Sequence, residues 1–351
     1  MKGFGLVSRM ITLAALLAVA AISPVHAQAL PDAPGLGRAI AAQERHSDAL
    51  LLNADIVGTG VGLTRGGEPA VMIFAARADV GGLPRSLDGV PVVVRVTGRI
   101  SALSHKEGHS QGGGSGGGGG IDPTQRFERP VPIGVSTGNS TQCTSGTIGA
   151  RVVDGLGNLY ALSNNHVFAL ENGARIGDSI VQPGRFDTNC VVDLANDVVA
   201  VLDDYVEIVF SETAVNTVDA AIALTSGADL GTATPADGYG TPGSVTLPPA
   251  VGMAVQKYGR NSSLTRGEIT AINATVRIDY IAGTATFVEQ IVVESSGPFL
   301  KSGDSGSLLV AEDGFNSPVG LLFAGNRSGK FAVANDIENV LTSFGVTIDG
   351  Q

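Results

Sequence analysis

Two residues in the last two thirds of the chain could carry out nucleophilic chemistry together. Of five histidines, His166 alone falls in the β-rich region beyond residue 121, where an apolar run ends in a polar turn. Ser305 stands in Gly303-Asp304-Ser305-Gly306, before another apolar run. An imidazole can take the proton of a serine hydroxyl, and glycines let a tight turn aim N–H groups at an oxyanion. Each feature alone also fits a structural histidine or an ordinary turn, whereas together they indicate acyl transfer.

A buried carboxylate should hold the imidazole from behind, and Asp219 is the predicted residue. It precedes the small apolar run from Ala220 to Ala223. Burying this charge without a partner would be unfavourable, so Asp219 needs a donor such as the ring of His166. Asp203-Asp204 has the character of a solvated turn. The competing carboxylates are Asp193, Asp197, Asp203 and Asp204.

Taken together, these residues resemble the chymotrypsin-like (trypsin-fold) serine peptidases. The chain order His166, Asp219, Ser305 is that of this family, and it differs from the Asp-His-Ser and Ser-Asp-His orders of other folds. The run from Lys257 to Arg260 is also similar to a stretch that opens the second barrel in bacterial members. The resemblance covers residues from about 145 to about 340.

The resemblance implies a mechanism for the three residues. Ser305 would attack a peptide carbonyl, His166 would take its proton, and Asp219 would stabilise the imidazolium. The backbone N–H groups of Gly303 and Ser305 would form the oxyanion hole. The chain is thus predicted to be a serine endopeptidase that acts on peptides or proteins and uses no cofactor or metal ion.

Three positions depart from the animal enzymes of this family. No cysteine follows His166 directly. Arg129 is followed by Pro130 where an activation sequence would stand, so a new terminal amine is not expected to pair with Asp304. Phe299, six residues before Ser305, stands where the base of the specificity pocket often lies. Without a carboxylate there, the enzyme should prefer small or apolar side chains to lysine or arginine.

Residues 123–351 are predicted to form the peptidase domain, of the all-β class. Short β-like runs recur there between turn signals, which is typical of antiparallel barrels or sandwiches. The resemblance implies two antiparallel six-stranded barrels, at about 130–230 and about 245–335, with the active site in the cleft between them.

Within this domain, two details of the second barrel follow from the residues. The runs 267–272 and 275–280 are predicted as separate strands. Asp336 to Phe344 predicts a C-terminal helix, with Asp336 near its start and Gly345 after it.

Three further segments precede the peptidase domain. Residues 1–27 have the basic start, apolar run and small-residue end of a secretory signal peptide, with an uncleaved anchor as the alternative. Residues 28–104 predict a small α+β module, with a helix near 35–51 and strands at 56–63, 70–76 and 90–96. Residues 105–122 are a Gly/Ser-rich linker. The module is either a pro-region, removed after assisting folding or blocking the cleft, or a retained accessory module.

Charge and cysteine content limit the partners and the compartment. The net charge of −11 disfavours nucleic acid as a partner, and once the signal is removed no membrane span is expected. The two cysteines, Cys143 and Cys190, favour a disulfide over two buried thiols in an exported protein. The predicted location is therefore outside the cell or in the periplasm.

Two other functions remain open from the sequence. A catalytically silent peptidase fold could serve as a binding module, in which case one triad position should be geometrically broken. An esterase could use the same three residues and would differ only in the leaving group.

Overall fold

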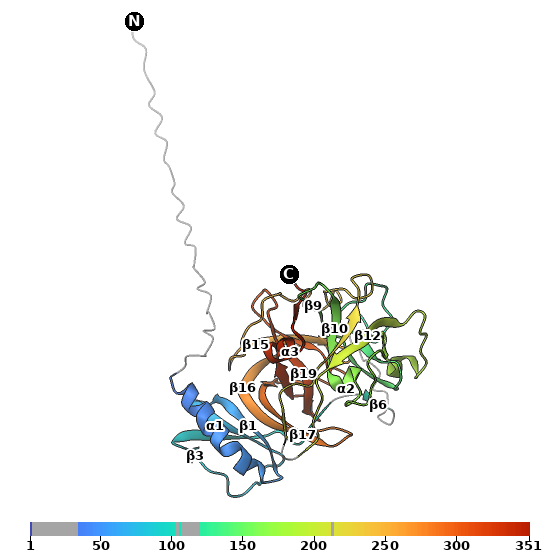
Figure 1. Ribbon diagram of the computed structural model, residues 1–351. Helices are drawn as coiled ribbons and strands as arrows, with labels where there is room; N and C mark the ends of the chain where they lie inside the picture. The colour runs from blue at the N-terminus through green and yellow to red at the C-terminus, as the bar shows by residue number, and fades with distance from the viewer. Residues whose placement is uncertain (2–33, 103–104, 107–119, 212–213) are drawn as a thin grey trace.

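The computed structural model describes Met1 and residues 34–102, 105–106, 120–211 and 214–351. The predicted signal peptide and residues 107–119 of the predicted linker lie outside the described residues. Strands dominate the rest and form two large sheets, with α3 and the C-terminus close to both (Figure 1). No helix of the described residues combines the length and apolar character needed to cross a membrane.

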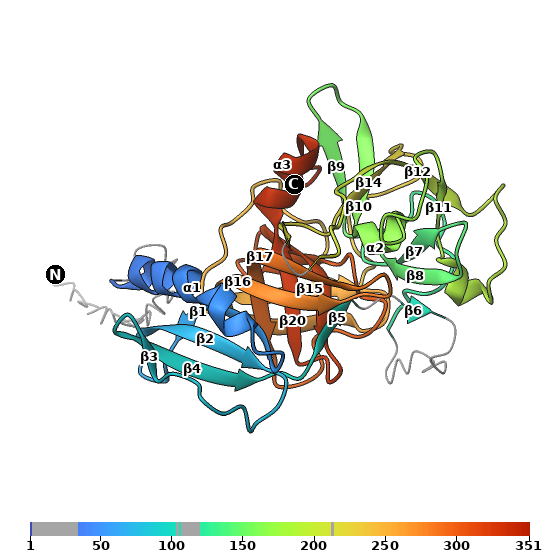
Figure 2. The same ribbon diagram turned by 60° about the horizontal axis from the view of Figure 1, so that its bottom comes forward.

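An N-terminal unit of one helix and a small sheet confirms the α+β elements predicted there. The helix α1 (Leu36–Leu51) covers strands β1 (Ile56–Leu63), β2 (Pro69–Ala75) and β4 (Val90–Val96), with β3 (Ser86–Leu87) at the edge (Figure 2). β1 is antiparallel to β2, and β2 is parallel to β4. Apolar side chains of the helix and sheet form a core of their own, including Leu36, Ala39, Ala42, Val61, Val71, Leu87 and Val90.

The larger sheet has twelve strands and includes this unit, because β1 pairs with β16. The strand order is β13-β17-β20-β19-β18-β15-β16-β1-β2-β4-β3, β16 also pairs with β17, and β5 pairs with β16 and β19. The strands not yet bounded are β5 (Ile100–Ala102), β13 (Val215–Asn216), β15 (Ala254–Gly259), β16 (Ser263–Asp279), β17 (Thr284–Glu294), β18 (Leu308–Ala311), β19 (Pro318–Asn326) and β20 (Phe331–Asp336).

The second sheet has nine strands, in the order β21-β9-β10-β14-β12-β11-β7-β8-β6. Its ends are short edge strands, one from the start of the predicted linker and one from the end of the peptidase region. The bounds are β6 (His105–Lys106), β7 (Ser136–Asn139), β8 (Thr144–Thr147), β9 (Ala150–Asp154), β10 (Leu159–Ser163), β11 (Ser179–Val181), β12 (Val198–Tyr205), β14 (Ala221–Thr225) and β21 (Val346–Ile348).

The predicted pair of closed six-stranded barrels is not what the sheets form. β16 is longer than β15, and β15 pairs only with the first half of β16. Its second half leaves an edge at Ile272–Val276 that β1 occupies, so the sheet continues into the N-terminal unit. The nine-stranded sheet is an open path that ends at β6 and β21. The prediction of a mostly β domain is confirmed.

The predicted C-terminal helix is confirmed as α3 (Ile337–Phe344). Asp336 caps it, because its Oδ1 accepts a hydrogen bond of 2.9 Å from the N–H of Glu338. Gly345 ends the helix with φ +63°, in the left-handed region that glycine tolerates.

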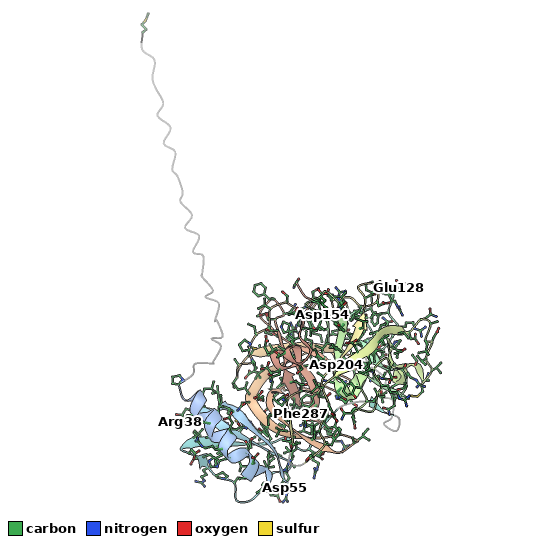
Figure 3. The ribbon with its side chains drawn as sticks, in the orientation of Figure 1. Arg38, Asp55, Glu128, Asp154, Asp204 and Phe287 are labelled. Atoms are coloured by element: carbon green, nitrogen blue, oxygen red, sulfur yellow. A yellow bond between two sulfur atoms is a disulfide. The ribbon has the colours of Figure 1, made fainter. Side chains whose placement is uncertain are left out.

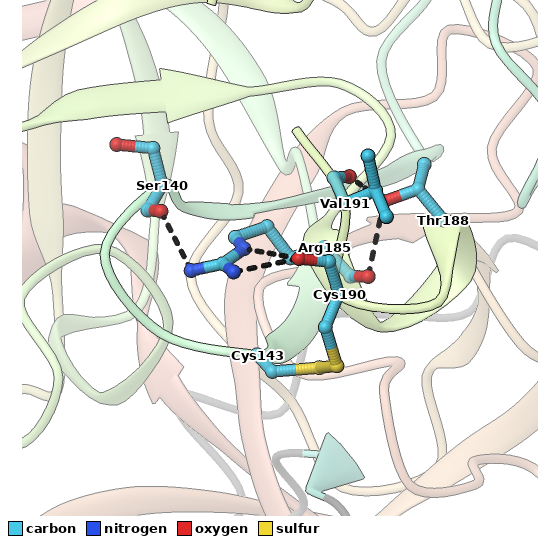
Figure 4. Close-up of a disulfide and its surroundings, with 6 residues drawn as sticks. All are labelled: Ser140, Cys143, Arg185, Thr188, Cys190 and Val191. Atoms are coloured by element: carbon cyan, nitrogen blue, oxygen red, sulfur yellow. Dashed lines mark hydrogen bonds between the residues drawn. A yellow bond between two sulfur atoms is a disulfide. The ribbon is translucent and has the colours of Figure 1, made fainter. Parts of the chain in front are cut away.

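The two cysteines are joined in a disulfide between Cys143, just before β8, and Cys190, after the 3₁₀ turn Arg185–Thr188 (Figure 4). Their Cα atoms lie 5.1 Å apart, and 47 positions separate them in the chain. The guanidinium of Arg185 donates to the carbonyl oxygens of Ser140 and Cys190, at 3.0 and 2.6 Å. The side chain of Arg185 thus links the backbone of Cys190 to the backbone of Ser140, three residues before Cys143.

Candidate active site

The imidazole of His166 is held by Asp219. β10 ends at Ser163, and the short helix α2 (Asn165–Phe168) carries His166 directly after it. The ring Nδ1 lies 2.6 Å from Oδ2 of Asp219, and the backbone N–H of His166 donates to Oδ1 at 3.2 Å. Both side chains are fully buried. The ring of His166 is the donor that the sequence analysis named for Asp219.

Asp219 receives one donor that sequence reasoning missed. The hydroxyl of Tyr280 donates to Oδ2 at 2.8 Å, so this oxygen accepts from both the ring and the phenol. Tyr280 follows β16, and no local pattern links it to Asp219. Burial and the Asp219 carboxylate raise the pKa of Tyr280 well above its ordinary value, so the phenol remains a donor.

The backbone around Asp219 is also fixed by hydrogen bonds. Its carbonyl accepts from Nδ2 of Asn164 at 2.7 Å, and its N–H donates to Oδ1 of Asn335 at 3.0 Å. Asn335 in turn donates to Oε1 of Gln290 at 2.7 Å. The Asn335 and Gln290 links tie the backbone of Asp219, and so its carboxylate, to strands β20 and β17 of the other sheet.

None of the competing carboxylates occupies this position. Asp197 is buried, but it pairs with Arg126. Asp193 closes a local turn with Asn196. Asp203 and Asp204 are exposed, as predicted, although they lie on strand β12 and not in a turn.

Ser305 lies in a turn that only glycines permit on both sides. Gly303 and Gly306 have φ values of +95° and +92°, and a Cβ at Gly306 would meet Oγ of Ser163 and the carbonyl of Thr147 at 2.3 Å. The N–H of Thr147 donates to the carbonyl of Ser305 at 2.8 Å, and its hydroxyl donates to the carbonyl of Gly303 at 2.8 Å. The turn before β18 is therefore attached directly to β8.

Contacts through β8 bring the turn near the histidine. Oγ of Ser163, three residues before His166, donates to the carbonyl of Thr147, whose N–H donates to Ser305. A Cβ at Gly146 would meet both Val167 and the carbonyl oxygen of Ser305. The residues adjoining His166 and Ser305 thus pack against the same strand.

The hydroxyl and the imidazole are not hydrogen-bonded to each other in this structure. Oγ of Ser305 donates to the carbonyl of Phe323 at 3.3 Å. Within the described part of the chain, Nε2 of His166 is buried and has no hydrogen-bond partner. A buried polar nitrogen without a partner is uncommon in folded proteins, so this nitrogen is a candidate to accept a hydrogen bond from a hydroxyl.

The amides predicted to form the oxyanion hole lie in the same turn. The backbone–backbone hydrogen bonds of the described residues include none donated by the N–H of Gly303 or of Ser305. Donors without acceptors beside a serine hydroxyl could bind a developing oxyanion.

Asp304 fixes this turn from the inside. Its carboxylate lies 3.1 Å from Nζ of Lys257 and accepts from the N–H groups of Lys301 and Asn261, both at 2.7 Å, and from Oγ of Ser262 at 2.5 Å. Burial alone would raise the pKa of Asp304, but the Lys257 ammonium and these hydrogen bonds lower it below its ordinary value. An internal lysine thus neutralises this carboxylate.

A cavity of about 1050 Å³ adjoins the site. Phe299, predicted at the base of a specificity pocket, is fully buried in an apolar cluster, and its neighbours Pro298 and Leu300 line the cavity instead. The described lining residues are Arg99, Ser101, Ala102, Glu171, Asp279, Tyr280, Ile281, Pro298, Leu300, Lys301, Ser302, Asn326, Arg327, Ser328 and Gly329.

Residues at the end of the predicted module and at the start of the predicted linker also reach this region. β5 is antiparallel to β19, with Ala102 opposite Ala324 and Ile100 opposite Asn326. β6 is antiparallel to β8, with His105 opposite Ser145. No local pattern in the sequence predicts that these residues pair with the peptidase region.

For metal ions the described residues offer no group of three or more His, Cys, Asp or Glu side chains arranged as ligands.

Comparisons with known proteins give only distant likenesses. No family model and no curated protein matches the chain. Solved structures that it resembles include a glutamic acid specific serine protease (19% identity, 62% of this chain, 100% of that chain, TM-score 0.45). Protease A of Thermobifida fusca is 16% identical, over 63% of this chain and 100% of that chain, with a TM-score of 0.45. Chymotrypsin of Cellulomonas bogoriensis is 20% identical, over 64% of this chain and 100% of that chain, with a TM-score of 0.42. At these identities and TM-scores the likenesses carry no conclusion about activity, so the function is argued from geometry.

Proposed function

We propose that the protein is an exported serine endopeptidase in which His166, Asp219 and Ser305 form the catalytic triad. The main support is the His166–Asp219 pair: Nδ1 is bonded to the carboxylate at 2.6 Å, whereas Nε2 is buried and free to accept a proton within the described residues. The tautomer is set because the carboxylate requires a donor at Nδ1. Ser305 lies in a glycine turn that packs against the strand adjoining this ring.

The proposed reaction proceeds by acyl transfer. Rotation of the Ser305 side chain away from the carbonyl of Phe323 brings Oγ to Nε2 of His166. Oγ then attacks the peptide carbonyl carbon while Nε2 takes its proton, and Asp219 stabilises the imidazolium. The N–H groups of Gly303 and Ser305 bind the oxyanion. The imidazolium protonates the leaving amine, and water then hydrolyses the acyl-enzyme by the same steps.

Ser305→Ala tests the proposal directly. The wild-type protein should cleave members of a broad peptide library and react with a fluorophosphonate probe, and Ser305→Ala should do neither. Ser343→Ala, at an exposed serine of α3, is the matched control and should behave like wild type. Equal peptide cleavage by wild type and Ser305→Ala would contradict the proposal.

The same assay separates the two other functions. A silent binding module would leave wild type unreactive toward the probe despite the intact His166–Asp219 pair. An esterase would be labelled and would hydrolyse p-nitrophenyl esters without cleaving any peptide. The preformed hydrogen bond to Nδ1 favours an active enzyme over the silent module.

We also propose that residues 28–104 are a pro-region and not a retained module. β1 extends the edge of β16, and a single apolar cluster joins the unit to the peptidase region. Phe74 of β2 packs edge-on against Phe331 of β20, with ring centroids 5.2 Å apart. Phe287 of β17, labelled in Figure 3, belongs to the same cluster.

A buried polar network strengthens this docking. Nε2 of Gln43 on α1 donates to the hydroxyls of Thr59 and Thr275, at 2.9 and 3.3 Å, and its Oε1 accepts from Asn273. Thr275 and Asn273 belong to β16, so the unit is matched to that strand by specific contacts. Intact-mass measurement of the secreted protein tests removal: a chain that starts near Gln28 would show that the unit is retained.

A further inference from the structure

The cavity beside the candidate site is joined to that site at two places. Tyr280 lines the cavity, and its hydroxyl donates to Oδ2 of Asp219 at 2.8 Å. Ser302 lines it as well, three residues before Ser305 in the chain. A peptide whose carbonyl lies at Oγ of Ser305 thus has this cavity beside its nearest side chain. The inference drawn from the lining of the cavity rests on the proposed peptidase function.

One wall of the cavity consists of two loops that are hydrogen-bonded to each other. The first loop supplies Leu300 and its neighbours, and the second supplies residues 326–329. The carbonyl of Gly329 accepts from the N–H groups of Phe299 and Leu300, at 2.8 and 3.1 Å. Gly329 has φ +70°, and a Cβ there would collide with the carbonyl oxygen of Leu300. The close approach of the two loops therefore requires this glycine.

This wall carries two cations, one on each loop. Lys301 and Arg327 both line the cavity, and both are exposed. Within the described residues, neither side chain takes part in an ion pair. The backbone of Lys301 is fixed, because its N–H donates to the carboxylate of Asp304 at 2.7 Å. Two charges of one sign in the wall of a cavity attract a ligand of the other sign.

The carboxylates of the cavity lie around the turn between β16 and β17, and both have donors. Glu171 accepts from two backbone N–H groups of this turn, at 3.4 and 2.7 Å. Asp279 accepts from the hydroxyl of Thr284 at 3.0 Å and lies 3.7 Å from the guanidinium of Arg99. If the unit that contains Arg99 is removed, Asp279 keeps the bond from Thr284. Among the described lining residues, the charges without a partner are therefore both positive.

We propose that the cavity binds an acidic side chain of the substrate through Lys301 and Arg327, so that the enzyme cleaves after glutamate or aspartate. The acidic residue is the one whose carbonyl Ser305 attacks, because its side chain lies nearest to that hydroxyl. The two cations suit its carboxylate. The apolar lining residues Pro298 and Leu300 suit the methylene groups of a glutamate.

This preference differs from the small or apolar side chains expected from Phe299. That expectation required Phe299 at the base of the pocket, whereas its side chain is fully buried in an apolar cluster and is not among the described residues that line the cavity. Lysine and arginine stay disfavoured, because the two cations repel a third. The net charge of −11 repels acidic peptides at long range, so their recognition depends on cations within the cavity.

A pair of matched peptides tests the proposal on the exported protein. Two fluorogenic peptides that differ only in glutamate or glutamine before the scissile bond have nearly the same shape and differ in charge. Wild type should cleave the glutamate peptide with a kcat/KM about 30-fold higher, as expected for charge-assisted hydrogen bonds. The ratio should fall in about 1 M salt, which screens exposed charges. In a broad peptide library, cleavage should follow glutamate or aspartate.

Lys301→Met and Arg327→Gln each remove one charge and keep much of the length of the side chain. Each should lower the glutamate-to-glutamine ratio of kcat/KM about 5-fold, and the double variant should bring the ratio close to 1. Both peptides are measured on the same preparation. A partly misfolded variant therefore loses both rates and keeps the ratio, which separates misfolding from loss of charge recognition.

Lys330→Gln is the matched control, because Lys330 is an exposed cation close to Arg327 in the chain that is not among the described lining residues. It should keep the wild-type ratio, and an equal fall there would overturn the inference, because net charge would then set the preference. A wild type that cleaves peptides without preferring acidic residues, or a double variant that keeps the ratio, also overturns it and leaves the proposed function intact. A wild type that cleaves no peptide and does not react with the fluorophosphonate probe overturns both.

Discussion

Among the described residues, two ion pairs have both side chains completely shielded from solvent, and only one of the two is fully satisfied. In both the His166–Asp219 and the Lys257–Asp304 pairs the side chains are entirely buried. Nζ of Lys257 donates to Oγ of Ser262 and to the carbonyl of Ser263, in addition to its contact with Asp304. In the other pair, Nε2 of His166 has no partner among the described residues.

Under the proposed function, this difference separates a structural pair from a reactive one. A buried pair whose every polar atom is bonded holds its surroundings in one arrangement, and breaking it leaves an uncompensated charge. A buried pair with one free nitrogen keeps a position for a proton, at a site where burial strengthens electrostatic interactions. The same kind of contact thus orders the turn in one case and, in the proposed mechanism, provides a base in the other.

Asp219→Asn should produce the largest effect on activity. The amide cannot hold the required tautomer, because it can present a donor where Nδ1–H needs an acceptor, and kcat should fall by about 10⁴-fold. Kinetics with a library peptide that the wild type cleaves would measure the loss. The thermal midpoint should change little in comparison, and a loss under 10-fold would show that Asp219 does not serve His166 as proposed.

Asp304→Ala should instead act mainly on stability. It leaves the Lys257 ammonium buried without its counter-charge, so the free energy of unfolding should fall by about 3 to 5 kcal/mol. Urea denaturation measures this. The double variant Lys257→Met with Asp304→Leu should recover much of the loss, and a double variant as unstable as the single one would show that the charge pair is not the cause.

The residues of the candidate site could be selected from the sequence alone. His166, Asp219 and Ser305 each carry a local signature, because a lone histidine, a glycine turn and a charge before an apolar run are visible without coordinates. Tyr280 was missed because its role depends on how β16 and β17 cross to the other sheet. Lys257 was recognised within a motif, but its partner Asp304 is 47 residues away by sequence number, and spacing alone does not specify such a pair.

Some strand bounds were predicted wrongly, for a physical reason that β16 illustrates. Residues 267–272 and 275–280 were predicted as two strands, whereas the structure has one strand, Ser263–Asp279. Asn273 has φ +49°, and the pairing with β17 shifts register between Ala271 and Val276. A β-bulge with an asparagine resembles a turn in sequence. Whether β1 pairs with this bulged edge depends on tertiary contacts that no local pattern records.

The smallest expected effect is the acid dependence of the satisfied pair. The pKa of Asp304 is lower in the folded protein than its ordinary value of 3.8, so folding releases a proton there. Its contribution to stability is therefore complete above about pH 4 to 5 and is lost as the pH falls through the lowered pKa, by about 1.4 kcal/mol for each unit of lowering. Unfolding free energies between pH 3 and pH 7 would show a shallower acid decline in Asp304→Asn than in wild type. Parallel declines in the two proteins would mean that Asp304 stays ionised to the same extent folded and unfolded, and that the Lys257–Asp304 pair does not contribute to acid stability.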